Sequence, residues 1–168
     1  MIVSLTGPEC SGKTYLAINI AKAYKTTYLP EAARMYPLNE GYSFEDVCTL
    51  ATKQAELIHR LNSKPGLKVV DSDMIVFEVW FLERFNKLPD NWEEIKLQGR
   101  VDLHLLCKPD IPWEADPIRE NESDRDRLFQ QYLRVFRKNR FIFEIIEGVK
   151  DARFSRCLEF LNKKKAAH

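Results

Sequence analysis

Long apolar runs, a secretion signal and paired cysteines are all absent from this sequence. No apolar stretch approaches the roughly 20 residues that a membrane-spanning helix needs. The N-terminus lacks the basic segment, apolar core and cleavage site of a signal peptide. The cysteines at positions 10, 48, 107 and 157 form no Cys-x-x-Cys pair, so neither a zinc site nor a disulfide framework is indicated. We therefore expect reduced thiols and a cytoplasmic protein.

A surplus of charge of either sign is also missing. The chain has 26 Lys and Arg residues against 25 Asp and Glu residues, a formal net charge of +1, which does not favour nucleic acid or a membrane as partner. Internal repeats and low-complexity segments are absent, and 168 residues is the length of one domain. We expect a single domain over residues 1–168 with a small-molecule partner. The sequence indicates no oligomeric state.

Glycine is scarce, with six residues, yet two of them stand in one motif. Residues 7–14 read Gly-Pro-Glu-Cys-Ser-Gly-Lys-Thr, the G-x-x-x-x-G-K-T pattern of a phosphate-binding P-loop. The glycines permit backbone angles that bring N–H groups onto phosphate oxygens. Lys13 adds a positive charge, and the hydroxyl of Thr14 can ligate Mg²⁺. The alternative is a glycine-containing surface turn, but the apolar run before the motif and the helical pattern after it favour the P-loop. We expect ATP and Mg²⁺ as cofactors, held by Gly7, Glu9, Cys10, Ser11, Gly12, Lys13 and Thr14.

Short apolar runs alternate with helical stretches along the chain, which is typical of a parallel sheet with crossover helices. After the first strand at residues 2–5, we expect strands at residues 26–29, 67–71, 101–107 and 140–146. Right-handed crossovers make this five-stranded parallel sheet a doubly wound α/β fold with three layers, α/β/α. P-loop kinases of this size share that arrangement, and by analogy with them we expect the strand order 2-3-1-4-5.

Charged side chains follow the second and third strands, where the ligand crevice of an open parallel sheet lies. Glu31 and Arg34 are site candidates after the second strand, with an ion pair at a helix start as the alternative. Asp71 ends the third strand and can hold Mg²⁺ beside Thr14. Asp73 is either a catalytic carboxylate or the cap of the next helix. A kinase needs one carboxylate to accept the hydroxyl proton, and position alone does not choose between Glu31 and Asp73.

Three further features are candidates for the site. Gln54 falls on the buried face of a helix, as a satisfied core amide or a substrate contact. Trp80 lies in an aromatic-rich helix, where core packing and stacking on a substrate ring are both open. Residues from about 110 to 127 are predicted to form a lid, with a solvated helix start as the alternative. Its arginines, which can reach the transferring phosphoryl group, are Arg119, Arg125 and Arg127.

These motifs together resemble one family. Residues 7–14, 29–34, Gln54, 71–73 and 110–119, the last reading Asp-Ile-Pro-Trp-Glu-Ala-Asp-Pro-Ile-Arg, occur in the order found in one kinase domain. That domain is the ribosylnicotinamide kinase of the bifunctional bacterial NAD-biosynthesis regulators, and the chain is similar to it over nearly its whole length. It departs from the residues usual in that family at Cys10, Ala32, Ser72 and Pro117.

The resemblance implies a P-loop kinase that transfers the γ-phosphoryl group of ATP to a hydroxyl of nicotinamide riboside, giving nicotinamide mononucleotide for NAD biosynthesis. Related deoxynucleoside kinases place a glutamate after the second strand as the base, which favours Glu31. Two alternatives stay open: a kinase for another nucleoside or small hydroxyl compound, and a P-loop ATPase or nucleotide switch. The resemblance implies catalytic roles for Lys13, Glu31, Asp73 and Arg119, phosphate contacts by Arg125 and Arg127, and a substrate site of Glu31, Arg34, Gln54, Asp73 and Trp80.

Overall fold

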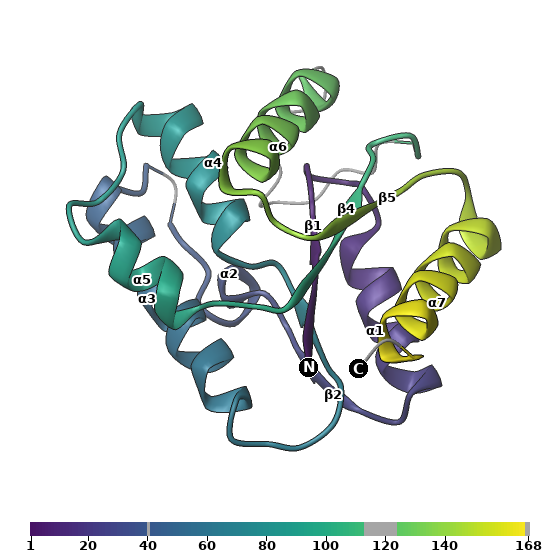
Figure 1. Ribbon diagram of the computed structural model, residues 1–168. Helices are drawn as coiled ribbons and strands as arrows, with labels where there is room; N and C mark the ends of the chain where they lie inside the picture. The colour runs from purple at the N-terminus through teal and green to yellow at the C-terminus, as the bar shows by residue number, and fades with distance from the viewer. Residues whose placement is uncertain (40, 113–123, 167–168) are drawn as a thin grey trace.

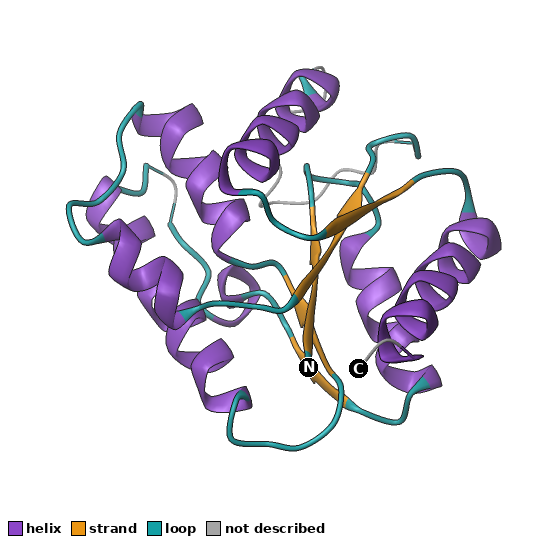
Figure 2. Ribbon diagram, in the orientation of Figure 1, coloured by secondary structure: helices purple, strands orange, loops and turns teal. Residues whose placement is uncertain are grey.

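Five parallel strands form one sheet in the order β2-β3-β1-β4-β5. Figure 2 shows the strands as orange arrows. The computed structural model describes residues 1–39, 41–112 and 124–166. The strands are β1 (Ile2–Thr6), β2 (Thr27–Leu29), β3 (Lys68–Asp71), β4 (Leu103–Cys107) and β5 (Phe143–Ile146). The predicted fold class and strand order are confirmed.

Helices cover both faces of this sheet and complete the three layers (Figure 1). On one face lie α1 (Lys13–Ala23) and α7 (Lys150–Ala166); on the other lie α2 (Ala32–Met35), α3 (Phe44–Leu61), α4 (Met74–Phe85), α5 (Trp92–Gln98) and α6 (Arg125–Asn139). Val3 and Leu5 join the buried cluster of α1 and α7, whereas Ile2 joins that of α3 and α4. Successive β1 side chains thus enter opposite cores, as in a central parallel strand. In the described part of the chain, no helix combines the length and apolar character needed to cross a bilayer.

The start of α3 shows how a local signal sets a boundary. Ser43 Oγ accepts a hydrogen bond from the backbone N–H of Asp46 at 3.1 Å, and a carboxylate oxygen of Asp46 accepts one from the N–H of Ser43 at 2.8 Å. This reciprocal capping box satisfies two N–H groups that the helix itself cannot pair. The helix therefore begins directly after Ser43, and it ends at Leu61.

The start of β5 differs from the prediction. The apolar run at residues 140–146 contributes its last four residues to the strand. Arg140 instead ends α6 in a left-handed conformation with φ 54°, and Phe141 packs against Phe136 of α6 with ring centroids 6.2 Å apart. Of this run only Ile146 is fully buried, and Ile142 is exposed. The apolar run therefore overestimated the length of the strand, because Phe141 packs against a helix rather than within the sheet.

The loops that follow the strands meet at the carboxyl edge of the sheet. The P-loop follows β1, Glu31 follows β2, and residues 108–112 follow β4. Parallel strands place all such loops at one edge, so residues far apart in the sequence face a common crevice.

Candidate active site

The P-loop closes around the side-chain ammonium of its own lysine. Lys13 Nζ donates to the carbonyl oxygens of Gly7 at 2.9 Å and Pro8 at 2.8 Å. Gly7 has φ 131°, and a Cβ there would lie 2.5 Å from the carbonyl oxygen of Cys107, so any side chain would collide with the end of β4. Gly12, at φ 79°, is the N-cap of α1 and directs the positive end of that helix into the loop. The loop therefore has the shape, charge and dipole that bind phosphate.

Thr14 and Asp71, the two residues expected to hold magnesium, are in direct contact. Thr14 Oγ1 donates to Asp71 Oδ2 at 2.6 Å, and the hydroxyl of Tyr28 lies 3.3 Å from the same oxygen. The other oxygen, Asp71 Oδ1, is buried and accepts no hydrogen bond from any described residue. A buried carboxylate oxygen without a partner is costly, and Mg²⁺ commonly binds through one carboxylate together with phosphates and water. These residues therefore fit Mg²⁺.

Glu31 lies on the wall of the cavity that contains the P-loop. Burial raises the pKa of this carboxyl, the nearby Lys13 opposes that rise, and Asp71 adds to it; the net pKa is above the ordinary glutamate value. A carboxylate with a raised pKa beside a phosphate site is suited to accept a proton from an attacking hydroxyl. The geometry thus chooses Glu31 over Asp73 as the candidate base.

Asp73 has a different environment, which corrects the expectation that it contacts substrate. It is buried at the N-cap of α4, where Oδ1 accepts the N–H of Ile75 at 2.9 Å and Oδ2 lies 2.7 Å from Nδ1 of His104. It is not among the residues that line the cavity. Burial alone would raise the pKa of Asp73, but His104 and the cap lower it below the ordinary value. The capping alternative therefore describes Asp73.

We expect Asp73→Asn to act on stability. At about pH 7 the variant should lose about 1.5–3 kcal/mol of unfolding free energy, because a charged buried acceptor is removed. The pKa of folded Asp73 is lowered, so its contribution is complete above the ordinary value of 3.8 and is lost as the pH falls below 3.8 and through the lowered pKa of the folded state. Urea unfolding near pH 7 and near pH 3 should show the difference shrinking in acid. Exposed Asp90→Asn is the control, and equal stabilities at pH 7 would contradict this role.

Gln54 is also a structural residue. Its Oε1 accepts the N–H of Ala32 at 2.8 Å, and its Nε2 donates to the carbonyl oxygen of Ser72 at 2.9 Å. The side chain is fully buried and absent from the cavity wall, which corrects the expectation of a substrate contact. The amide joins the start of α2, directly after Glu31, to the segment directly after Asp71. It therefore positions the elements that carry two site carboxylates.

A cavity of about 1120 Å³ runs along the carboxyl edge of the sheet. The P-loop residues predicted to hold nucleotide all line it, and so do Glu31 and Arg34. Its wall also contains Trp80, whose Nε1 donates to the Tyr42 hydroxyl at 3.0 Å. The two rings meet edge to face with centroids 5.5 Å apart. Trp80 also stacks on Phe77 at 5.9 Å, so it both packs in the core and presents an aromatic surface to the cavity.

The predicted lid arginines lie in different places. Arg125 Nη1 donates to the carbonyl oxygens of Ile111 at 2.9 Å and of Cys10 in the P-loop at 3.3 Å. Arg127 lines the cavity and forms a bidentate ion pair with Glu83. Its Nη1 donates to Oε1 at 3.0 Å and its Nη2 to Oε2 at 2.6 Å. Arg119 and most of the predicted lid, residues 113–123, lie outside the described residues. The lid and the role of Arg119 stay predictions.

Comparison with known proteins identifies the family. Residues 2–152 match a family model described as an AAA domain. The chain belongs to this AAA-domain family. It is also 26% identical over 172 residues to the trifunctional NAD biosynthesis/regulator protein NadR of Salmonella typhimurium strain LT2, covering 96% of this chain and 42% of the relative. NadR of Escherichia coli K12 matches with the same identity and coverage. The chain thus spans less than half the length of these curated relatives.

Solved structures support the fold of this AAA-domain protein. A crystal structure of NadR in complex with NR has a TM-score of 0.83 and 21% identity, covering 96% of this chain and 50% of that chain. NadR in complex with NAD and AMP-PNP has a TM-score of 0.80 and 19% identity, and the match covers 96% of this chain and 48% of that chain. A thymidylate kinase from Candida albicans has a TM-score of 0.71 and 12% identity, and the match covers 98% of this chain and 92% of that chain. The P-loop kinase fold and the resemblance read from the motifs are both confirmed.

Two cavity residues of this AAA-domain protein, Tyr132 and Arg153, were not predicted. Tyr132 is buried in α6, and its pKa is raised by that burial and by nearby carboxylates, including Glu31. Arg153 lies in the first turns of α7 with a side chain only 4% exposed. Position after the last strand could have indicated Arg153, because the loops there also face the crevice. No local pattern marked Tyr132, which stands among the apolar residues of its helix.

Proposed function

We propose that this protein is an ATP- and Mg²⁺-dependent kinase that phosphorylates a hydroxyl of nicotinamide riboside to give nicotinamide mononucleotide. The observation that carries the proposal is the position of Glu31, a carboxyl with a raised pKa on the wall of the cavity that also contains Lys13 and Thr14. A nucleotide switch has no need of a proton acceptor there. The sequence matches to NadR and the similarity to NadR bound to NR support the choice of acceptor.

The P-loop holds the donor in this proposal. Its N–H groups and the N-terminus of α1 bind the phosphates of ATP, and Lys13 exchanges its contacts with Gly7 and Pro8 for phosphate oxygens. Thr14 and Asp71 hold the magnesium ion, which when bound neutralises charge on the phosphates. The similarity to NadR in complex with AMP-PNP supports ATP as the nucleotide.

The acceptor occupies the half of the cavity beyond Glu31. Nicotinamide riboside carries a positively charged, flat pyridinium ring, and such rings are attracted to the faces of aromatic side chains. Trp80 and Tyr42 provide aromatic surface in this half. The ribose then points toward Glu31, which accepts the hydroxyl proton as the oxygen attacks the γ-phosphorus. Arg34, on the same wall, contacts the substrate or the phosphoryl group.

Incubation of the purified chain with ATP, Mg²⁺ and candidate acceptors tests this function. We expect nicotinamide mononucleotide and ADP in equal amounts, and a lower kcat/KM for adenosine, cytidine, uridine and thymidine. Preference for another nucleoside would replace the proposed acceptor. Release of inorganic phosphate with no phosphorylated acceptor would instead support an ATPase or switch.

A further inference from the structure

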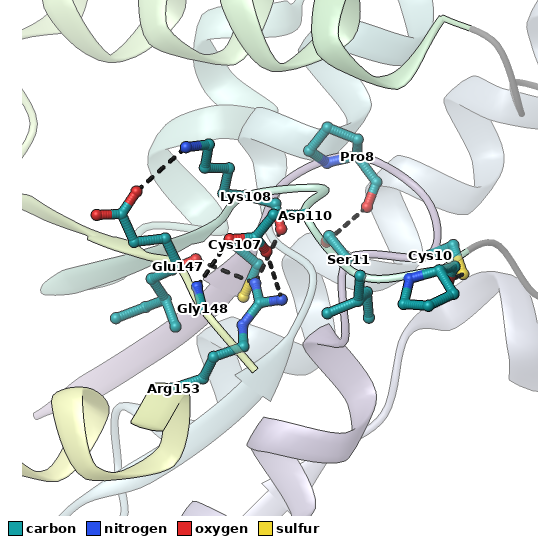
Figure 3. A network of polar contacts seen from close by, with 12 residues as sticks. Pro8, Cys10, Ser11, Cys107, Lys108, Asp110, Glu147, Gly148 and Arg153 are labelled. Atoms are coloured by element: carbon teal, nitrogen blue, oxygen red, sulfur yellow. Dashed lines mark hydrogen bonds and ion pairs between the residues drawn. The ribbon is translucent and has the colours of Figure 1, made fainter. Parts of the chain in front are cut away.

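An ion pair joins α7 to the loop after β4 at the cavity wall, and Figure 3 shows it from close by. Arg153 Nη1 donates to Asp110 Oδ1 at 3.0 Å, and its Nη2 donates to the carbonyl oxygens of Lys108 at 2.9 Å and Ile146 at 3.0 Å. The second carboxylate oxygen of Asp110 accepts the N–H of Gly148 at 2.7 Å. One buried guanidinium and one carboxylate thus join the ends of β4 and β5 to α7.

Residues 110–112, here called the strap, continue from this pair to the P-loop. The carbonyl oxygen of Pro112 accepts the thiol of Cys10 at 3.3 Å. The Ile111 side chain lies 3.5 Å from the position that a Cβ on Gly12 would take. The carbonyl oxygen of Ile111 also accepts Nη1 of Arg125, which reaches the carbonyl oxygen of Cys10 as well. The strap is therefore fixed at one end by Asp110 and touches the phosphate-binding loop along the rest of its length.

Fold stability alone is a weak reason for this arrangement. A buried ion pair contributes little more than well-packed apolar residues of the same volume. A guanidinium does fix the relative orientation of the groups that it binds, because its planar fork holds several acceptors in one geometry. Here the acceptors are the ends of two strands and the first residue of the strap. Ile111, Pro112 and Arg153 all line the cavity that contains the P-loop. By fixing the backbone of the strap, the ion pair therefore also fixes part of the wall of the phosphate site.

We propose that Arg153 and Asp110 are positioning residues for the donor nucleotide, which act through the strap on the shape of the P-loop. They hold residues 110–112 against Cys10 and Gly12, so that the loop is formed before ATP arrives. The proposal rests on ATP being the donor and is independent of the acceptor.

Two variants separate this role from a purely structural one. Arg153→Lys keeps the charge but loses the planar fork, and Asp110→Asn keeps the shape but loses the charge. Calorimetry with ATP and Mg²⁺, below the unfolding temperature of every variant, should show Kd for ATP raised at least tenfold in each. At saturating ATP, KM for the acceptor should change less than twofold. Because the two residues touch, their effects should not add. The double variant should therefore have about the same Kd for ATP as the single variant with the higher Kd.

Arg156→Met is the matched control. Arg156 also joins α7 to β5, through Glu144 at 2.9 Å, but it is half-exposed and absent from the cavity wall. It should lose no ATP affinity. Lower unfolding temperatures with unchanged Kd in both Arg153→Lys and Asp110→Asn would overturn the proposal. If Arg153→Lys does not fold, the near-isosteric Asp110→Asn decides alone. Failure of the native chain to bind ATP would overturn the proposed function as well, so the two failures are distinguishable.

Discussion

Lys13→Ala is expected to reduce phosphotransfer from ATP to nicotinamide riboside by at least about 10²–10³-fold, the usual effect of removing one preorganised donor from a developing charge. Lys13 is the P-loop side chain that carries positive charge, and its ammonium lies within hydrogen-bond distance of two loop carbonyls. It can therefore follow the γ-phosphoryl group as negative charge builds up. Initial rates with the native and variant chains at saturating substrates measure the effect.

The fold of the Lys13→Ala variant should survive. The two carbonyl oxygens that lose their partner, those of Gly7 and Pro8, belong to a partly buried contact, so the cost should be about 1–3 kcal/mol at most. Lys22→Ala, an exposed substitution on the same helix, is the matched control and should keep full activity. A Lys13→Ala chain with kcat within tenfold of the native value would refute the role given to this residue.

Glu31→Gln is expected to lower kcat by about 10²–10⁴-fold, the usual contribution of a positioned proton acceptor. Glutamine keeps the size and polarity of the side chain but cannot take the proton from the attacking hydroxyl. Because Glu31 is on the cavity wall and is not one of the residues proposed to hold ATP or Mg²⁺, KM for ATP should change little. Exposed Glu94→Gln is the control for loss of one carboxylate.

The pH profile gives a second test of Glu31. The base must be ionised to act, and the raised pKa means that it takes up a proton at a higher pH than the ordinary value of 4.5. The native kcat should therefore fall as the pH drops through a value above 4.5. Glu31→Gln should lack this acid limb. If the variant keeps both its activity and the acid limb, another group is the proton acceptor.

Local chemistry explains which parts of the molecule were predictable. The P-loop could be read from residues 7–14 because each function in it belongs to a particular residue type at a particular spacing. The start of α3 could be read from Ser43 and Asp46, because a capping box involves only neighbours in the chain. The strand order followed from analogy with P-loop kinases, and the apolar runs placed the strands to within three residues.

Contacts over long sequence distances give the two candidate bases different environments. Asp73 lies in reach of His104, 31 residues away, and is held there as a helix cap. Glu31 instead lies on the cavity wall, with Lys13 and Asp71 as nearby charges. Both carboxylates follow a strand in the sequence, so the same positional argument applied to each of them. Only packing against β4 gave them different partners, and a different partner is what separates their pKa values.

By itself the sequence determined the P-loop, since the residues of that motif are contiguous. The tertiary structure decided the rest. It turned Gln54 from a candidate substrate contact into the link between α2 and the end of β3. It also brought Arg153 to Asp110 across 43 residues, a pairing that no local pattern could show. The physical reason is that phosphate is bound by local backbone geometry, whereas the base, the aromatic wall and the strap depend on which strands lie side by side.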